Sequence, residues 1–307
     1  MSTHHHQSVM FDESIKGLNI EKNGIYVDAT FGRGGHTTGI LTKLSQSGRV
    51  IAFDRDKSAI DFAKSKFSDN RLELLHCTFS NIKDVVETQD LVGKINGILI
   101  DLGVSSPQLD NAERGFSFLR DGPLDMRMDQ SNGLSAKVWL AQANEEEIAK
   151  VLYEYGEEKK SRQIAKAIKL HQKQKAIETT FDLSQIISSV VRKEKNKHPA
   201  TRSFQAIRIF INQELQELLA VLEHCIHLLS KKGRLAVITF HSIEDRIVKQ
   251  FIQKNSRPKP LPKGLPVSND QIEQVVLKDL GKQLPSDDEI KLNPRARSAI
   301  LRVAEKC

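Results

Sequence analysis

A glycine-rich turn and the acids around it are the first candidates for chemistry in this sequence. Residues 28–36 read DATFGRGGH, so an acid is followed by glycines and then by a pattern typical of a helix start. Glycines let the backbone turn sharply and approach a ligand, and the free N–H groups of the following helix can donate to it. About twenty residues further on, Asp54 ends the second predicted strand. An acidic side chain at that place can accept hydrogen bonds from the ribose hydroxyls of a nucleotide cofactor. These features together predict an adenosine-bearing cofactor.

That cofactor is either a dinucleotide or S-adenosylmethionine. A dinucleotide fingerprint requires G-x-G-x-x-G, which leaves room for a pyrophosphate at the helix N-terminus. This chain has Gly32, Gly34 and Gly35 but no glycine at the last position of that motif. Asp28 and Asp101 would repel a pyrophosphate, whereas they suit the cationic sulfonium and amino group of S-adenosylmethionine. The residues therefore favour a methyltransferase over an oxidoreductase.

The elements that must position these residues alternate between strand and helix. Short β-rich runs separated by helical patterns are typical of βαβ units around a parallel sheet. The predicted strands are 25–30, 49–54, 72–77, 97–103, 234–240 and 298–303, and the predicted helices between them include 36–46, 56–67 and 242–254. After Gly103, about thirty residues are turn-rich and irregular. A loop of that length is usually functional or disordered.

A helical segment follows that irregular stretch, from about 135 to 229, with capping-type starts at Asn144 and Asp182. The economical interpretation is one α/β sheet interrupted by an insertion. We expect one α/β domain formed by 1–106 and 214–307, and an inserted helical domain, 107–213.

The charge of the chain is uneven. The 307 residues carry 46 Lys and Arg against 39 Asp and Glu, a net charge of +7. Residues 150–202 hold 13 basic and 6 acidic residues, which accounts for the whole excess. A concentrated positive field favours a polyanion such as nucleic acid. The alternative is a solvated helix face, because apolar residues recur there at helical spacing with lysines opposite.

The composition of the chain indicates its cellular compartment. No apolar run approaches membrane-spanning length, and the N-terminus lacks the pattern of a secretion signal. Cys77, Cys225 and Cys307 fit neither a disulfide framework nor a zinc cluster. We therefore expect a cytoplasmic protein. His4–His6 would make only a weak metal site, and no catalytic metal is predicted.

Eight ordered sequence blocks resemble one known family. They are DATFGRGGHT, FDRD, ILIDLGVSSPQLD, RGFSF, DMRMD, RSFQAIRIFINQEL, FHSIEDR and NPRARSAILR. Together they resemble the bacterial ribosomal RNA small-subunit methyltransferase H family, also called RsmH or MraW, from His6 to Arg302. The resemblance implies S-adenosylmethionine-dependent methylation of the exocyclic N(4) amine of a cytidine in the decoding region of small-subunit ribosomal RNA. It also implies a Rossmann-like methyltransferase core, with the inserted helical domain binding the RNA substrate. The cofactor contacts that it implies are Gly34, Gly35, His36, Asp54, Phe79, Asp101 and Gln108.

The reacting groups are expected just after the fourth strand. Amino methyltransferases commonly carry a D/N/S-P-P-aromatic motif there, but this chain has Asp101 followed by Ser105, Ser106 and Pro107, without the aromatic residue. A cytosine amine attacks poorly until acceptors orient its protons. Asp101, Ser105 and Pro107 are therefore the catalytic candidates.

Because the aromatic residue of that motif is missing, the motif assigns no side chain to stack on the target base. Phe116, Phe118 and Phe240 are the candidates for this stacking, and His241 is a further candidate to face the pocket. Phe79 could stack on adenine or simply belong to the core, and the Gln108 amide could hold a ligand or close a turn.

The expected partner is small-subunit ribosomal RNA or the small ribosomal subunit, with a homodimer possible and no membrane association. Two other classes stay open at this point. One is a DNA amino methyltransferase, which the departure from the D-P-P-aromatic motif disfavours. The other is a ribosome-assembly protein that binds RNA with a vestigial cofactor pocket, against which the intact Gly34, Gly35, Asp54 and Asp101 argue.

Overall fold

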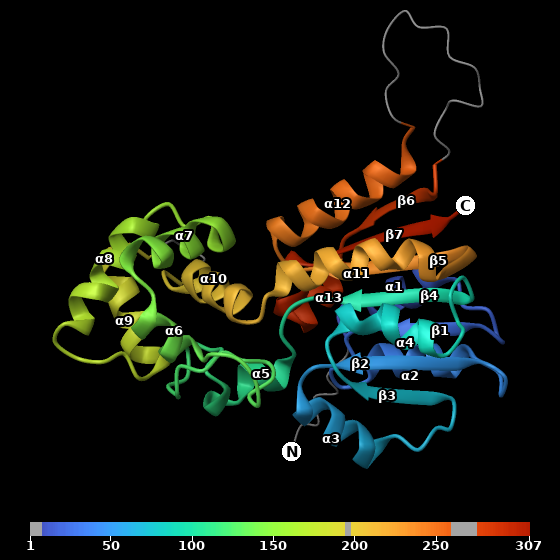
Figure 1. Ribbon diagram of the computed structural model, residues 1–307, viewed down its shortest axis with the longest axis horizontal. Helices are drawn as coiled ribbons and strands as arrows, with labels where there is room; N and C mark the ends of the chain where they lie inside the picture. The colour runs from blue at the N-terminus through green and yellow to red at the C-terminus, as the bar shows by residue number, and fades with distance from the viewer. Residues whose placement is uncertain (1–7, 194–197, 259–274) are drawn as a thin grey trace, which may run out of the picture. The chain divides into compact units, whose positions relative to one another are not determined.

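The chain folds into two compact units. The computed structural model describes residues 8–193, 198–258 and 275–307 (Figure 1). Met1–Gly103 with Gln216–Cys307 form what we call the sheet unit, and Val104–Leu215 form the helical unit. The predicted boundaries were 106/107 and 213/214. His4–His6 lie outside the described residues.

The sheet unit is built on a seven-stranded sheet with the order β3-β2-β1-β4-β5-β7-β6. The strands are β1 (Ile25–Asp28), β2 (Arg49–Asp54), β3 (Leu72–His76), β4 (Ile95–Asp101), β5 (Leu229–Thr239), β6 (Leu277–Gln283) and β7 (Ile300–Lys306). The pairs from β3 to β5 are parallel, and β7 is antiparallel to both β5 and β6. The arrows of the parallel strands point to one edge of the sheet (Figure 1). The Rossmann-like α/β prediction is confirmed.

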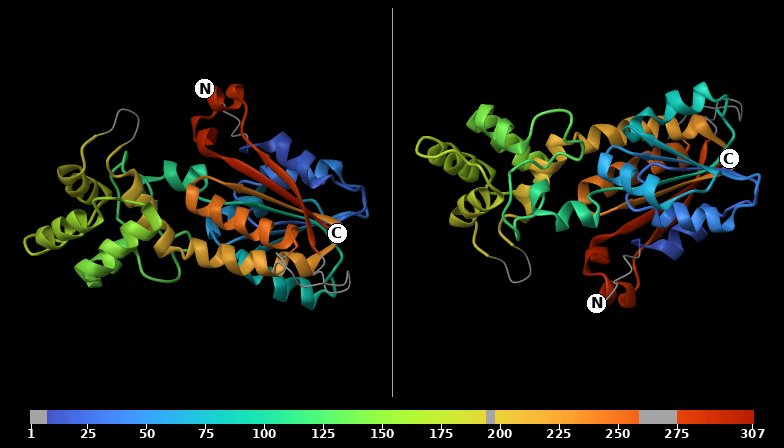
Figure 2. Two further views of the ribbon diagram at one scale, coloured as in Figure 1. Left: turned by 90° about the horizontal axis from the view of Figure 1, so that it is seen from above. Right: turned by 90° about the horizontal axis from the view of Figure 1, so that it is seen from below.

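Helices cover both faces of this sheet, as the two views in Figure 2 show. One face carries α1 (Phe11–Leu18), α2 (Gly35–Lys43) and α3 (Lys57–Lys66), and the other carries α4 (Ile82–Thr88), α11 (Glu214–Leu228) and α12 (Ser242–Ser256). Successive strand residues point to opposite faces. Val50 therefore joins the core under α1 and α2, while Ile51 joins the core under α4, α11 and α12.

The helical unit has its own core around Leu140, Leu152 and Ile164. Its elements are α5 (Ser106–Asp110), η2 (Ala112–Arg114), α6 (Ala136–Gln142), α7 (Glu145–Gly156), α8 (Ser161–Gln172), α9 (Thr180–Val190) and α10 (Thr201–Ile211). Asn144 caps α7 as predicted, since its side chain accepts from Glu147 N at 2.9 Å.

The predicted helix start at Asp182 is wrong. Thr179 is the N-cap of α9, and its hydroxyl accepts from Asp182 N at 3.2 Å. Asp182 is the third helical residue, whose carboxylate accepts from Thr179 N in return. Asp182 thus belongs to the capping box that Thr179 begins.

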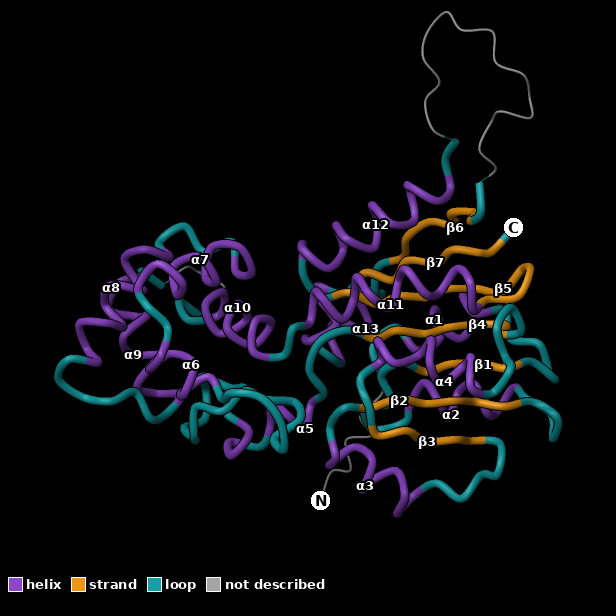
Figure 3. Tube along the Cα trace, viewed as in Figure 1, coloured by secondary structure: helices purple, strands orange, loops and turns teal. Residues whose placement is uncertain are grey.

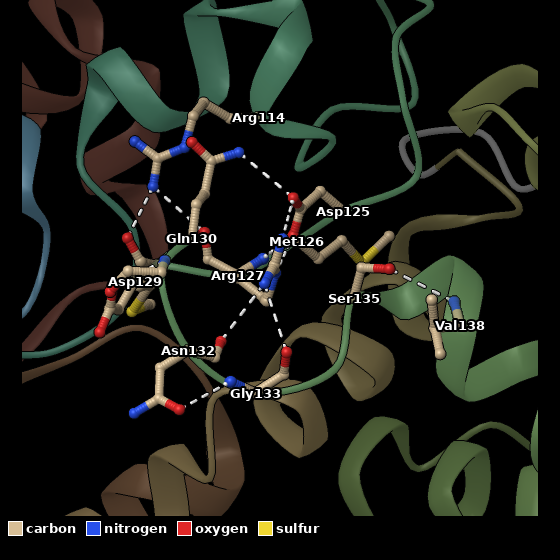
Figure 4. Close-up of polar contacts among 12 residues, drawn as sticks. Arg114, Asp125, Met126, Arg127, Asp129, Gln130, Asn132, Gly133, Ser135 and Val138 are labelled. Atoms are coloured by element: carbon tan, nitrogen blue, oxygen red, sulfur yellow. Dashed lines mark hydrogen bonds and ion pairs between the residues drawn. The ribbon is translucent and has the colours of Figure 1, made fainter.

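The long stretch before α6 is irregular but tightly organised (teal in Figure 3). Arg114, 7% exposed, donates from Nη2 to the carbonyl oxygens of Arg127 at 3.1 Å and Met128 at 2.8 Å. Asn212 donates to Met126 O at 2.7 Å and accepts from Met128 N at 2.8 Å. Arg127 forms a two-pronged ion pair with Asp125, with distances of 2.7 and 2.9 Å (Figure 4). These contacts hold the stretch in one backbone conformation.

Four of the described α-helices and strands in the sheet unit were not predicted from the sequence, namely α1, α4, β6 and α13 (Asp287–Leu292). The edge strand β6, LKDLGKQ, is exposed at every position but the first, so it lacks the apolar alternation of a half-buried strand. Helix α1 buries only one strongly apolar residue, Leu18, beside Ser14 and Gly17.

Candidate active site

The glycine turn joins β1 to α2, and its two central glycines are required by close packing. Gly34 has φ +75°, and a Cβ atom there would meet the rings of Phe67 and Phe31. A Cβ atom on Gly35 would meet the Ser8 hydroxyl. Any side chain at these positions would displace the turn, because its neighbours are already in contact with the backbone.

Asp54 is the last residue of β2, and its carboxylate fastens the glycine turn. Oδ2 accepts from Gly32 N at 2.8 Å, and Oδ1 accepts from Asp56 N at 2.8 Å. Burial raises the pKa of Asp54 to about 6, although both backbone hydrogen bonds act to lower it. The side chain is still partly exposed, so its remaining lone pairs can accept from a ligand.

His36 and Asp101 form a pair with unused hydrogen-bonding capacity. His36 lies in the first turn of α2, is 4% exposed, and has Nε2 3.5 Å from Asp101 Oδ2 at the end of β4. Among the residues that the structure describes, no hydrogen-bond partner reaches either ring nitrogen of His36 or Asp101 Oδ1. Burial alone would lower the pKa of His36, but the carboxylates of Asp101, Asp28 and Glu289 outweigh it and raise that pKa above its ordinary value. Buried polar atoms without partners are costly and point to a ligand that would complete them.

Asp28 has a different role from the one that its sequence position indicated. It is fully buried, and its carboxylate accepts from the Thr37 hydroxyl at 2.6 Å and from Thr30 N at 3.1 Å. Burial raises the pKa of this carboxyl group, and His36 opposes the rise. Asp28 thus braces the turn from inside and offers no exposed carboxylate to a sulfonium.

Thr30 is a structural link that the sequence patterns missed. Its hydroxyl accepts from Asp101 N at 2.7 Å, so it joins the glycine turn to the end of β4. No signal in one sequence marks this threonine, because the link depends on two strands that lie far apart in the chain. It fixes Asp101 relative to the turn.

Phe79 begins the 3₁₀ helix η1 (Phe79–Asn81) directly after β3. It is half-buried and packs against the core cluster that contains Phe53 and Ile82. Because β1, β2, β3 and β4 are parallel, the glycine turn, Asp54, Phe79 and Asp101 all follow carboxyl ends of strands at one edge of the sheet.

Ser105, Pro107 and Gln108, the other predicted site residues, belong to the helical unit. Ser105 is the N-cap of α5 and Pro107 lies in its first turn. The Gln108 side-chain oxygen accepts from Ser105 N at 2.8 Å, so the amide closes a capping box. Their roles toward the cofactor and the reacting amine stay predictions.

His241 lies at the N-terminus of α12 as a helix cap. Its Nδ1 faces Glu244 N at 3.4 Å, and its Nε2 lies 2.9 Å from Glu244 Oε1. Both ring nitrogens are therefore directed at one neighbouring residue. This arrangement favours the capping interpretation over a pocket-facing histidine.

The described part of the chain bears on metal binding and on membrane insertion. Within it, no three His, Cys, Asp or Glu side chains come together in a way that could hold a metal ion. None of the helices described there has the length and apolar character that crossing a bilayer requires.

Sheet order and site together define the class of protein. A seven-stranded sheet with an antiparallel β7, a glycine turn after β1, an acid ending β2 and another ending β4 is a Rossmann-like methyltransferase core. The chain belongs to the MraW methylase family, whose model matches residues 3–307. It is a methyltransferase, and its cofactor is S-adenosylmethionine.

The chain is similar over nearly its whole length to proteins named as ribosomal RNA small subunit methyltransferase H. The chain is 63% identical over 306 residues to the ribosomal RNA small subunit methyltransferase H of Vesicomyosocius okutanii, with 100% of both chains covered. It is 52% identical over 304 residues to the protein of that name from Shewanella oneidensis, covering 98% of this chain and 97% of the other. A solved rRNA methylase from Streptococcus thermophilus covers 96% of this chain and 94% of its own, at 15% identity and a TM-score of 0.40. That last likeness is too slight to add to the family assignment.

Proposed function

We propose that the chain methylates the exocyclic N(4) amine of a cytidine in the decoding region of small-subunit ribosomal RNA. The observation that carries the catalytic part is the His36–Asp101 pair, whose buried atoms lack partners among the described residues and which lies at the same end of the sheet as Asp54. The choice of cytidine N(4) and of the decoding region rests on the family resemblance alone, and the names of the relatives support small-subunit ribosomal RNA as the substrate.

The residues of the sheet unit fit S-adenosylmethionine. When bound, this cofactor supplies an electrophilic methyl group on a sulfonium. The partly exposed Asp54 carboxylate would accept hydrogen bonds from the ribose hydroxyls. His36 and Asp101 would bind its amino acid part, because a carboxylate and an imidazole present complementary groups to an ammonium and a carboxylate. Phe79 and Gln108 complete the proposed set of contacts.

Asp101 is also the group best suited to orient the reacting amine. The lone pair of a cytosine amine is delocalised into the ring, so acceptors for its protons help it to pyramidalise and attack. Asp101 Oδ1 is buried without a partner, and Ser105 and Pro107 of the next segment are the other proposed contributors. A base amine in a paired stack is unreachable, so the target cytidine must be unpaired or turned out of the stack.

The helical unit supplies the proposed RNA-holding surface along α8. Arg162, Lys166 and Lys173 are exposed and fall on one face of the helix at spacings of four and seven. Lys160 and Lys169 of the same basic stretch have internal partners, since Lys160 Nζ donates to Val190 O at 2.8 Å and Lys169 Nζ to Leu140 O at 3.1 Å. The exposed cations would bind phosphates without reading sequence.

The same proposal covers the binding partner, the cellular compartment and the oligomeric state. The partner is the small ribosomal subunit or its RNA, the compartment is the cytoplasm, and the chain acts as a monomer or a homodimer. A ribosomal substrate supports the cytoplasmic location, because assembling subunits are found there.

The test is a direct identification of the product. Labelled S-adenosylmethionine is incubated with the protein and unmodified small subunits, the RNA is digested to nucleosides, and the labelled nucleoside is identified by mass and retention. We expect N(4)-methylcytidine from one position. Label on duplex DNA but not on RNA would support a DNA amino methyltransferase instead, and RNA binding without cofactor binding would support a non-enzymatic assembly protein.

A further inference from the structure

The carboxyl ends of β4 and β5 lie side by side, and each leads into a tight turn. Asp101 is paired with Ile238 across the two strands, and Leu102 N donates to Ile238 O at 3.0 Å. The chain after Ile238 therefore runs alongside the chain after Asp101. Phe240 is the second residue beyond that pair, at the edge where the proposed reaction occurs.

The ring of Phe240 lies near Gly103, within van der Waals distance of the position that a Cβ atom would take there. Gly103 has φ +98°, and a Cβ atom built on it would lie 3.6 Å from Phe240 Cδ2. The ring is half-buried and packs on the core cluster that contains Ile238 and Leu99. Phe240 is thus partly exposed beside the segment that follows Asp101.

The backbone of Phe240 is held firmly. Phe240 N donates to Glu244 Oε2 at 2.9 Å, and Glu244 is 1% exposed. The other carboxylate oxygen of Glu244 lies 2.9 Å from His241 Nε2. The cap of α12 therefore fixes the backbone of the residue that carries the ring.

The other two aromatic candidates, Phe116 and Phe118, lie in the helical unit. Phe118 is half-buried, as Phe240 is, but its ring already contacts two aromatic neighbours. Phe31 of the glycine turn, although not among the candidates, is also an aromatic residue near the site. Phe31 is 3% exposed and meets Phe67 edge to face at 5.3 Å. In the helical unit, Phe116 is 6% exposed. Phe118 stacks on His198 at 4.5 Å and contacts Phe204 at 5.4 Å.

We propose that Phe240 is the residue on which the target base stacks. It would replace in space the aromatic residue that the D-P-P-aromatic motif places after the fourth strand and that this chain lacks. A base turned out of its stack loses its neighbours, and an aromatic face compensates because every base offers a π surface. The inference rests on the proposed function in so far as the methyl acceptor is a base.

The experiment compares Phe240→Leu and Phe240→Tyr with the wild-type protein. The kcat and KM for unmodified small subunits are measured at saturating S-adenosylmethionine, and the Kd for the cofactor is measured by calorimetry. We expect Phe240→Leu to lower kcat/KM for RNA by about ten-fold to a hundred-fold, and Phe240→Tyr to retain most of it. Cofactor affinity should stay unchanged in both variants, which also shows that the sheet unit is folded. Phe251→Leu, a half-buried phenylalanine of α12, is the matched control and should behave as wild type.

Three results would overturn the stacking role. They are a kcat/KM for Phe240→Leu within two-fold of wild type, a Tyr variant as impaired as the Leu variant, or a loss of cofactor affinity equal to the loss in kcat/KM. The nucleoside product separates this proposal from the proposed function. If the wild-type protein methylates another base, the cytidine assignment fails while the Phe240 comparison is judged by the same ratios. If it methylates ribose, both fail.

Discussion

Two polar clusters of the molecule, the backbone of residues 126–128 in the helical unit and the His36–Asp101 pair in the sheet unit, differ in how many of their hydrogen bonds are made. In the helical unit, Met126, Arg127 and Met128 each have both backbone groups hydrogen-bonded, through Arg114, Asn212 and Asp125. In the sheet unit, His36 and Asp101 are brought within 3.5 Å and still leave buried atoms without partners. A buried polar group without a partner costs free energy, so a fold that keeps two of them together implies a ligand that compensates. The backbone groups of residues 126–128 are all paired and stabilise the fold, whereas the incomplete His36–Asp101 pair is where we propose that the cofactor binds.

Arg114→Met should give the largest effect. It removes a buried guanidinium and leaves the carbonyl oxygens of Arg127 and Met128 without their donor, which we expect to lower the free energy of unfolding by about 3–4 kcal/mol. Trp139 is the only tryptophan of the chain and is buried in the core of the helical unit. Its fluorescence in a urea titration therefore reports this unit.

Arg162→Met is the matched control for that experiment, because Arg162 is exposed on α8. It should change stability by less than about 0.5 kcal/mol. Equal midpoints for the two variants would contradict a structural role for the Arg114 contacts. Cofactor affinity should be unaffected in both.

Asp101→Asn should lower turnover by about 100-fold at saturating S-adenosylmethionine, because it keeps the shape of the side chain but removes the charge that orients the amine. Saturation separates this effect from weaker cofactor binding. Asp279→Asn on the exposed strand β6 is the control. Near-normal turnover in Asp101→Asn would confine Asp101 to cofactor binding and leave Ser105 as the acceptor to test.

Asp54 should make cofactor affinity depend on pH. The ribose hydroxyls donate to the charged carboxylate, and its pKa is raised to about 6. Affinity should therefore fall as pH drops below about 6, approaching ten-fold per pH unit. For stability the sign is opposite: a carboxyl whose folded pKa is raised stabilises the fold fully below its unfolded pKa, and this contribution is lost as pH rises through about 6.

Calorimetry across this pH range, with Asp54→Ala alongside, checks the assignment. The variant should bind the cofactor about ten-fold to a hundred-fold more weakly at pH 8 and lose the dependence near pH 6. A variant with unchanged affinity would remove Asp54 from the site.

The smallest effect is expected on α8. Replacing Arg162, Lys166 and Lys173 together by Gln should weaken RNA binding for all sequences and reduce the salt slope by about two units. The control replaces Lys231, Lys249 and Lys254, three exposed lysines of the sheet unit, with the same loss of charge. If both triple variants have the same slope, the α8 residues are only a solvated helix face.

The sequence predicted what depends on local pattern. Strand β2 was predicted at its observed limits, and Asn144 was identified as a helix cap because the cap signal lies within one turn. The missed features depend on contacts between distant segments. Thr30 touches Asp101 across two strands, and Asp28 looked like a ligand group although Thr37 and Thr30 occupy its oxygens. Strand β6 was missed because an exposed edge carries no apolar alternation.

The most direct test of the central claim is a structure of the protein bound to S-adenosylhomocysteine, the product form of the cofactor. Our account predicts ribose hydroxyls within hydrogen-bond distance of the Asp54 carboxylate, and the amino acid part of the ligand in contact with His36 and Asp101, whose buried atoms would then have partners. A ligand bound elsewhere, or one that leaves His36 and Asp101 unpartnered, would contradict it.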